Sequence, residues 1–159
     1  MDGKQFQRTE DGHLILMSAD ERDLLITDLT ARIKYGVICL IERVDDFGPR
    51  FRDEKLTGFC YDEIGYFYFQ FGGGLDVEFA EKVKPYLRSM SSMTEEEKIE
   101  LCTVSYAPDE MKTIEEKLHV IQTNAENAAD FYNAHHFDYR GLIEKGLALE
   151  APEEMYKTN

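Results

Sequence analysis

The chain has 159 residues and a formal net charge of −14, from 18 lysines and arginines against 32 aspartates and glutamates. Its length suits one domain, and 43% apolar with 12% aromatic residues predicts a folded chain. The charge argues against direct nucleic-acid binding and against docking on an anionic membrane. The apolar stretch 14–17 is too short for a signal peptide, and no run approaches the ~20 residues that span a bilayer, so we expect a cytoplasmic protein.

The cysteines agree with a reducing compartment. Cys39, Cys60 and Cys102 are odd in number, far apart in the chain and never arranged as a CxxC pair. We therefore expect neither a structural zinc site nor a structural disulfide. Cys39 and Cys60 fall in apolar, strand-like runs, where a free thiol acts as a small hydrophobic side chain.

The first predicted helix begins at Ser18. Ser18 and Glu21 have the spacing of a capping box, in which each side chain accepts a hydrogen bond from a free backbone N–H of the other residue. The apolar residues that follow at intervals of four form one stripe, at Leu25, Leu29 and Ile33. Gly36 suits the left-handed conformation that ends many helices, so we expect the helix to end there.

Short apolar runs after this helix predict four or five antiparallel strands. The runs cover 37–44, 56–61, 66–71, 77–79 and 83–87. Asp62 and Gly65 occupy the first and fourth positions of a type I turn, which predicts a hairpin between the second and third runs. The pleat of the third run places Phe67, Phe69 and Phe71 on one face and polar side chains on the other, which is typical of a half-buried strand.

The second half of the chain is predicted to be helical and is the more acidic half. Thr94 and Glu97 repeat the capping-box spacing and predict a short helix that ends near Cys102. Residues 93–159 carry 6 basic against 15 acidic residues, a balance of −9, whereas the first 92 residues carry 12 against 17, a balance of −5.

A longer amphipathic helix follows. Pro108 is tolerated in a first helical turn, and apolar residues recur three and four apart from there to Tyr132. Asn124 and Asn127 leave either one helix or two. The tail from 137 to 159 is irregular, but it holds enough apolar residues to pack along the body of the protein.

This order of elements predicts an α+β fold. We expect an N-terminal helix, a small antiparallel sheet that could take the form of an SH3/Sm-like roll, C-terminal helices and an irregular packed tail. A loose arm over 1–17 is expected to precede one domain over 18–159. Within that domain, 18–92 hold the first helix and the β part, and 93–159 form the acidic helical part.

Three blocks of the sequence stand out as signature segments. They are VKPYLR at 83–88, MSSMTEEE at 90–97 and NAHHFDYRGLIEKGLALEAP at 133–152. With the leucine-rich helix and Tyr-Gly-Val of 24–37, the chain resembles a family of small uncharacterised proteins found in gut-bacterial genomes, often near prophages or other mobile elements. It departs from that family in the N-terminal arm and at Ser89, where the family often has proline. The resemblance implies a lineage and assigns no reaction.

Two adjacent histidines in the second half of the chain are candidate metal ligands. Two imidazoles and a carboxylate, from His135, His136 and Asp138, could bind a divalent metal. Adjacent residues at a helix end, however, point ~100° apart, and the spacing of four found in zinc proteases is absent. We therefore predict no metal site, and expect imidazoles that interact with the last carbonyls of a helix.

Tyr139 and Arg140 admit two interpretations. An arginine beside an aromatic ring could present its planar group to a carboxylate or a phosphate. In so acidic a protein, Arg140 could equally pair with the acidic helices and pin the tail, which is the interpretation we favour.

Nothing in the sequence has the spacing of a catalytic motif. The glycine run 72–74 precedes a strand-like segment and lacks the Lys-Ser/Thr of a phosphate-binding loop, so it predicts a flexible hairpin loop. Serines stand at predicted helix starts, where capping explains them. Neighbouring carboxylates are predicted to be solvated and to lack the contrasting environments of an acid–base pair. We predict no enzymatic activity and no cofactor.

These observations favour a non-enzymatic protein-interaction module of mobile-element origin that binds a protein partner. A sharper hypothesis is a decoy whose carboxylates imitate DNA phosphates and occupy a basic host protein. The residues expected to contact the partner are Glu95, Glu96, Glu100, Glu115, Glu116, Glu126, Tyr139 and Arg140.

Two other classes of function remain open. One is a small enzyme or ligand-binding domain that uses His135, His136, Tyr139 and Arg140. The other is an accessory subunit that assembles through an exposed sheet edge. The sequence does not define an oligomeric state.

Overall fold

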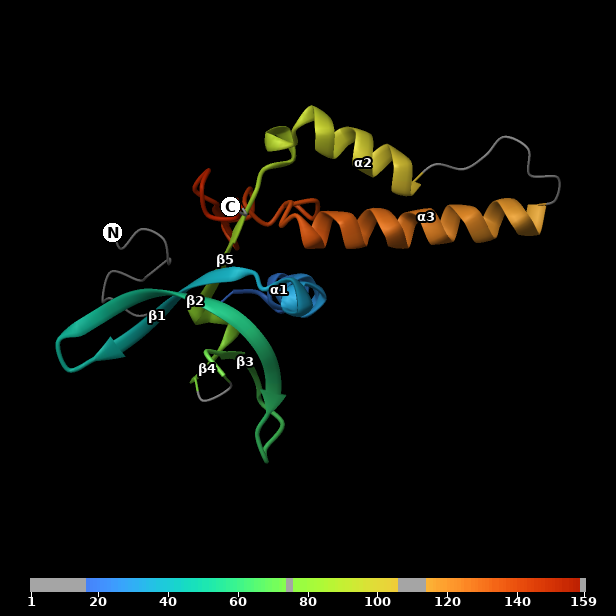
Figure 1. Cartoon of the computed structure of the whole chain (residues 1–159). Coiled ribbons are helices and arrows are strands. Elements are labelled where there is room, and N and C mark those ends of the chain that lie inside the picture. The colour runs from blue at the N-terminus through green and yellow to red at the C-terminus, as the bar shows by residue number, and fades with distance from the viewer. Residues whose placement is uncertain (1–16, 74–75, 106–113, 158–159) are drawn as a thin grey trace.

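The computed structural model describes residues 17–73, 76–105 and 114–157, except for the side chains of 103–105 and 114–123 (Figure 1). Apart from Met17, the arm predicted over 1–17 lies outside the described residues, as does Pro108, the predicted start of the longer helix. The elements that are described form a mixed fold of helices and one sheet, which confirms the α+β prediction.

The first helix, α1 (Ala19–Arg32), begins as its capping residues predict. The backbone N–H of Glu21 donates to the Ser18 hydroxyl at 3.2 Å, and the Glu21 carboxylate accepts from the Ser18 N–H at 2.9 Å. A short 3₁₀ turn, η2 (Ile33–Tyr35), continues the helix to Gly36. Gly36 has a φ of 68°, a conformation that glycine adopts without steric cost.

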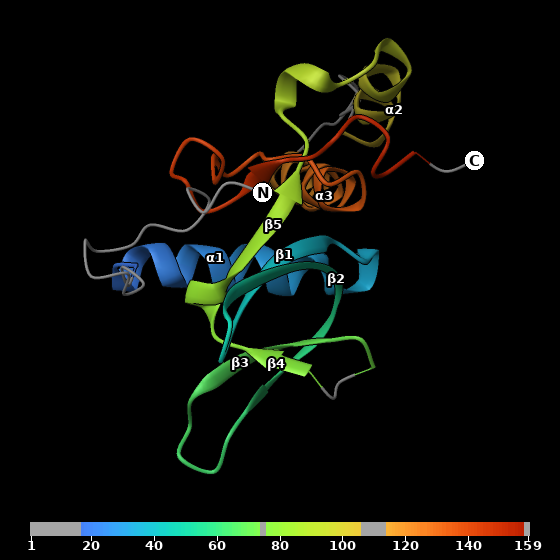
Figure 2. The same ribbon diagram turned by 90° about the vertical axis from the view of Figure 1, so that its left-hand side faces the viewer.

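In the described residues, six strands form one sheet in the order β4-β3-β2-β1-β5-β6 (Figures 1 and 2). The strands are β1 (Ile38–Asp45), β2 (Gly48–Tyr61), β3 (Phe67–Phe71), β4 (Asp76–Glu78), β5 (Val83–Leu87) and β6 (Leu149–Glu150). Every neighbouring pair is antiparallel except β5 and β6, which are parallel. The helix α1 lies between the β3–β4 end of the sheet and the C-terminal helices (Figure 2).

The strand β2 is longer than predicted: the sequence indicated a strand over 56–61, and the structure extends it back to Gly48. Its first half, 48–55, pairs with β1 in a register that runs from Asp45↔Gly48 to Ile38↔Lys55. Most of these added residues are exposed, so no alternation of buried side chains marked them as a strand. The second half of β2 pairs with β3, and the strand curves between its two partners to give the sheet a rolled shape (Figure 1).

The predicted hairpin between β2 and β3 is confirmed. The backbone N–H of Gly65 donates to the Asp62 carbonyl at 3.0 Å and closes the turn. Phe69 and Phe71 are fully buried, whereas Tyr66 just before the strand is exposed. The predicted alternation of buried and polar faces therefore holds along β3.

The first half of the central strand β1 is covered on both faces, which explains the uninterrupted apolar run at 37–41. On one face, Cys39 and Ile41 belong to the main core with the Leu25 and Leu29 stripe of α1. On the other face, Leu40 packs in a smaller cluster. That cluster also contains Ile38, Phe51, Tyr86, Leu149, Ala151, Met155 and Tyr156. The tail thus covers the face of the sheet opposite α1.

Two C-terminal helices, α2 (Glu95–Ser105) and α3 (Ile114–Ala134), lie side by side and extend from the body of the protein (Figure 1). The Thr94 hydroxyl accepts from the Glu97 N–H at 3.2 Å and the Glu97 carboxylate from the Thr94 N–H at 2.9 Å, so the second capping box is confirmed. Asn124 and Asn127 do not interrupt α3.

The tail after α3 packs on the body, as its apolar residues predict. Leu142 and Leu147 are buried in the main core. The tail also contributes β6, which was not predicted because two residues are too short for any periodic pattern to appear. Tyr86 pairs with Leu149, and Leu87 with Glu150.

Candidate functional site

A buried carboxylate on α1 binds two arginines. Asp28 and Arg32 are both fully buried and pair one helical turn apart, with Nε to Oδ2 at 2.8 Å and one terminal nitrogen to Oδ1 at 2.9 Å. Arg140 from the tail donates to the same Oδ1 at 2.9 Å. Asp28, Arg32 and Arg140, here called the Asp28 network, thus join the first helix to the tail.

The two arginines of the Asp28 network also contact the residues that follow α3. Arg32 donates to the Phe137 carbonyl at 2.7 Å. The guanidinium carbon of Arg140 lies 4.4 Å from the centre of the Tyr139 ring, and that ring stacks on Tyr132 at 5.1 Å. Arg140 therefore pins the tail, but its partner lies on α1 and not on the acidic helices.

A second polar cluster attaches α2 to the body. Arg88, just after β5, holds the Glu97 carboxylate with two nitrogens at 2.7 and 2.9 Å, and its guanidinium lies over the Phe137 ring at 4.3 Å. Hydrogen bonds from Arg88, with the Thr94 N–H, lower the pKa of Glu97 to about 2. Glu97 is therefore charged throughout the physiological range.

His135 belongs to the same cluster. Its Nδ1 lies 3.4 Å from a Glu97 oxygen and its Nε2 lies 3.7 Å from a Glu100 oxygen. The imidazole also packs on Phe131, with ring centres 4.4 Å apart. His135 thus lies between α3 and the first two turns of α2, and each ring nitrogen faces one carboxylate.

His136 faces a different part of the protein. Its ring stacks on Tyr156 of the tail at 3.8 Å, and its backbone has a φ of 60°. Burial, together with electrostatic contributions from Arg32, His135 and Arg88, lowers the pKa of His136 to about 4. This imidazole is therefore neutral near pH 7.

The three groups considered as metal ligands do not come together. His135 faces α2 and His136 faces the tail. The Asp138 carboxylate accepts hydrogen bonds from the backbone N–H groups of Leu142 and Ile143 at 2.7 and 2.9 Å. Within the described residues, no cluster of three or more histidine, cysteine or acidic side chains has the geometry to hold a metal ion.

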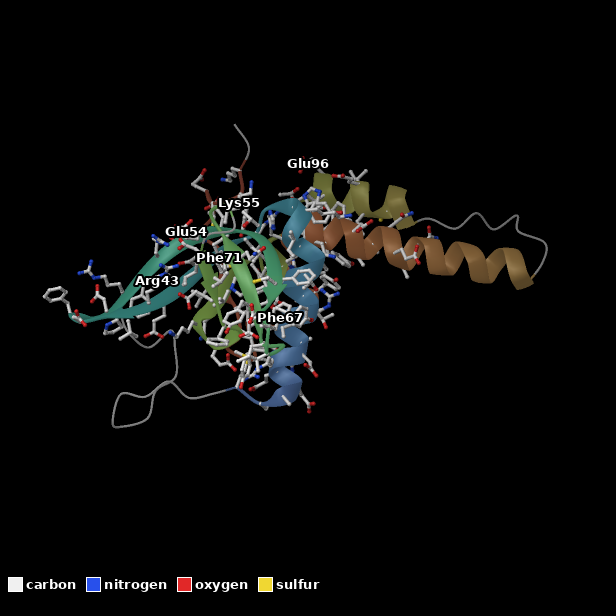
Figure 3. The ribbon with its side chains drawn as sticks, turned by 90° about the horizontal axis from the view of Figure 1, so that it is seen from below. Arg43, Glu54, Lys55, Phe67, Phe71 and Glu96 are labelled. Carbon is white, nitrogen blue, oxygen red and sulfur yellow. The ribbon has the colours of Figure 1, made fainter. Side chains whose placement is uncertain are left out.

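The predicted partner-binding carboxylates are only partly described. Glu95, Glu96 and Glu100 are exposed on α2, and Figure 3 shows the position of Glu96 on this helix. Glu126 is exposed on the neighbouring α3. The side chains of Glu115 and Glu116 lie outside the described residues.

Sequence reasoning missed one apolar residue among these carboxylates. Ile99 lies between Glu95 and Glu100 on α2, and 68% of its surface is exposed. It also missed the Asp28 network, although the spacing of four between Asp28 and Arg32 is typical of a helical ion pair. Nothing in the sequence pointed from Asp28 to Arg140.

Comparisons with known proteins give no relative from which a role could be carried over: no family model, curated protein or solved structure matches this chain. Among the helices that the structure describes, none is both long enough and apolar enough to cross a bilayer.

Proposed function

We propose that the protein is a non-enzymatic interaction module that binds a basic protein partner through the exposed side of α2. The observation that supports this is the placement of Glu95, Glu96 and Glu100 around the exposed side chain of Ile99. An apolar centre surrounded by charged groups resembles a protein–protein contact, in which the apolar residue contributes affinity and the charges contribute orientation and rate.

The charge of this surface favours a cationic partner. In the sequence of α2, four glutamates accompany one lysine. That lysine, Lys98, pairs with Glu95 on the same helix, and the carboxylate of Glu97 is held by Arg88. Unlike Glu97, Glu96 and Glu100 are exposed, although Glu100 also lies 3.7 Å from His135, and their field would attract lysine and arginine side chains.

The attachment of α2 would also favour binding. The ion pair between Arg88 and Glu97, with His135 beside it, holds the first turns of α2 against the body before any partner arrives. A surface that is already ordered loses less conformational entropy on association.

A finer form of the proposal is that the partner is a DNA-binding protein of the host and that the carboxylates take the place of phosphates. DNA carries about one negative charge per 1.7 Å of its axis, so a decoy needs closely spaced carboxylates. The successive glutamates of α2 provide closely spaced carboxylates along this helix. A cytoplasmic location and a mobile-element origin, as the sequence predicts, belong to the same proposal.

Binding to purified basic DNA-binding proteins at increasing salt concentration tests the proposal. We expect the affinity to fall about tenfold or more between low and physiological salt, because counterions screen the charges. The variant E95Q/E96Q/E100Q should lower the association rate. A matched variant, E144Q/E153Q/E154Q, removes the same charge from exposed sites in the tail and should bind like the wild type.

Two results would count against the proposal. Equal losses of binding in the two triple variants would mean that only the total charge matters. Unchanged binding in Ile99→Ser would mean that the apolar centre of α2 makes no contact.

A separate observation favours a second candidate, ligand binding at 133–140. Among the described residues, Asn133 Oδ1, His136 Nδ1 and the Tyr139 hydroxyl are buried without a hydrogen-bond partner in the protein. A buried polar group without a hydrogen bond costs the folded state about 1–3 kcal/mol, so a small molecule that supplied the missing bond would stabilise the folded protein. Thermal unfolding with inorganic phosphate or acetate tests this: a rise in Tm that Tyr139→Phe abolishes supports the site, and no rise rejects it.

A further inference from the structure

The hairpin of β2 and β3 carries an aromatic surface that continues the core into solvent. Phe69 is fully buried, Phe59 opposite it is 46% exposed, and Tyr61 further out is 64% exposed. Phe67 pairs with Tyr61 and is half-buried. Phe59, Tyr61 and Phe67 are called the hairpin aromatic face below.

A β-bulge in β2 determines which of its side chains lie on the same side of the sheet as the hairpin aromatic face. Leu56 pairs with Phe71 and Gly58 with Gln70, so Thr57 is an extra residue in the strand. A bulge of this kind shifts the alternation of side chains by one position. As a result Leu56 and Phe59, although three residues apart, both lie on the side of the sheet that faces the core.

The rings form a continuous ladder from the core to the hairpin end. Phe67 contacts Phe69 at 5.0 Å between ring centres, Phe59 at 5.5 Å and Tyr61 at 5.3 Å. Figure 3 looks at this end of the molecule, with Phe67 and Phe71 labelled. Because the rings support one another, the face keeps its shape without a partner. Ile64, in the turn of the same hairpin, is 82% exposed.

The charged side chains of the hairpin segment itself are acidic. Residues 56–75 contain two acidic residues, Asp62 and Glu63, and no lysine or arginine. The Asp62 carboxylate accepts hydrogen bonds from the Tyr66 and Ile64 N–H groups and from the Tyr68 hydroxyl, which lower its pKa and keep it ionised.

We propose that the hairpin aromatic face binds a segment of a partner protein that carries an apolar anchor flanked by lysine or arginine. Exposed aromatic clusters mark interaction sites, and aromatic rings attract cations as well as apolar groups. The two carboxylates at the turn complement the basic flanks. A second copy of the chain, also at −14, would bring like charges together, and an anionic lipid surface would be repelled.

This surface is distinct from the one proposed on α2. Figure 1 shows α2 and the β2–β3 hairpin at opposite ends of the protein, with the sheet and α1 between them. The inference therefore stands or falls separately from the proposed function. Variants of α2 serve as its control.

The test is a titration of the protein with a short synthetic peptide that alternates leucine with lysine. The chemical shifts of the backbone amides, measured by NMR at each peptide concentration, report where the peptide binds. We expect shifts confined to 58–68. Tyr61→Ser should weaken binding about tenfold or more, as for a central aromatic contact. Tyr66→Ser changes an exposed tyrosine of the same hairpin, on the opposite side of the strand, and should change affinity less than about twofold. E95Q/E96Q/E100Q should have no effect.

Three results would overturn the inference. One is equal binding of a peptide in which glutamate replaces lysine. Another is equal weakening by Tyr61→Ser and Tyr66→Ser. The third is a wild-type dimer in analytical ultracentrifugation that Tyr61→Ser converts to a monomer, since the second copy would then be the occupant. If Tyr61→Ser does not fold, Tyr61→Lys supplies the same comparison. The lysine removes the aromatic ring and repels the lysines of the peptide, so binding should weaken in the same way.

Discussion

Arg140 in the C-terminal tail binds Asp28 on the first helix, 112 residues earlier in the chain, at 2.9 Å. The same carboxylate oxygen accepts a hydrogen bond from the fully buried Arg32. One aspartate thus binds two guanidinium groups at the junction of α1, the end of α3 and the tail.

Asp28→Asn should destabilise the protein strongly. The substitution keeps the shape of the side chain but leaves Arg32 charged and buried without an anion. Breaking a buried pair in this way costs about 3–5 kcal/mol of unfolding free energy, measurable by urea denaturation. Asp23→Asn alters an exposed acid of the same helix and should stay within about 0.5 kcal/mol. Equal effects of the two would show that the network does not stabilise the fold.

Glu97→Gln should release α2 while leaving the core folded. The change removes the charge that Arg88 binds with two nitrogens. We expect faster amide hydrogen exchange over 95–105 and unchanged exchange in α1. Glu96→Gln, on the same turn, should leave exchange in both helices unchanged.

The acid sensitivity of α2 follows from the same carboxylate. The folded state lowers the pKa of Glu97 from 4.5 to about 2, so its contribution to stability is full above pH 4.5. That contribution is lost as the pH falls from 4.5 toward 2. The protection factors of the amides over 95–105, which correct for the pH dependence of intrinsic exchange, should fall across this window in the wild type. An equally steep fall in Glu97→Gln would contradict the assignment.

His136→Asn should reduce the pH dependence of unfolding between pH 6.5 and 4. The wild-type imidazole has its pKa lowered from 6.5 to about 4, beside Arg32, Arg88, His135 and Tyr156. The unfolded chain therefore binds more protons in this window, and stability falls as the pH drops from 6.5 to 4, by at most about 3 kcal/mol.

Asparagine is the suitable replacement because it tolerates the positive φ of position 136. Urea denaturation at a series of pH values measures how steeply the unfolding free energy changes with pH between 6.5 and 4. His135→Asn is the control and should keep most of this slope. A slope that persists in His136→Asn would assign the proton uptake to another group.

Tyr156→Phe should cost about 1–3 kcal/mol of unfolding free energy. The Tyr156 hydroxyl accepts from the Ile38 N–H at 3.0 Å and donates to the Tyr86 carbonyl at 2.8 Å. The phenylalanine ring keeps the packing on His136 but leaves both backbone groups without this partner. Tyr61→Phe, at an exposed position, should change stability by less than about 0.5 kcal/mol in the same denaturation assay.

Local patterns predicted most elements correctly because their signals lie within a few residues. Both capping boxes, the Gly36 helix end and the Asp62–Gly65 turn form hydrogen bonds between near neighbours in the chain. The first half of β2 and the whole of β6 gave no such signal. One is exposed, and the other is two residues long and exists only where the tail meets β5.

The sequence alone therefore determined where α1 and α2 begin, the strongly negative charge and the faces of β3, since each depends on composition or on contacts within one turn or one pleat. The tertiary structure decided the partner of Arg140, the separate surroundings of His135 and His136, and the exposure of Ile99 and Tyr61. These features depend on segments that approach from distant parts of the chain, and a linear pattern does not record which distant segment will be the neighbour.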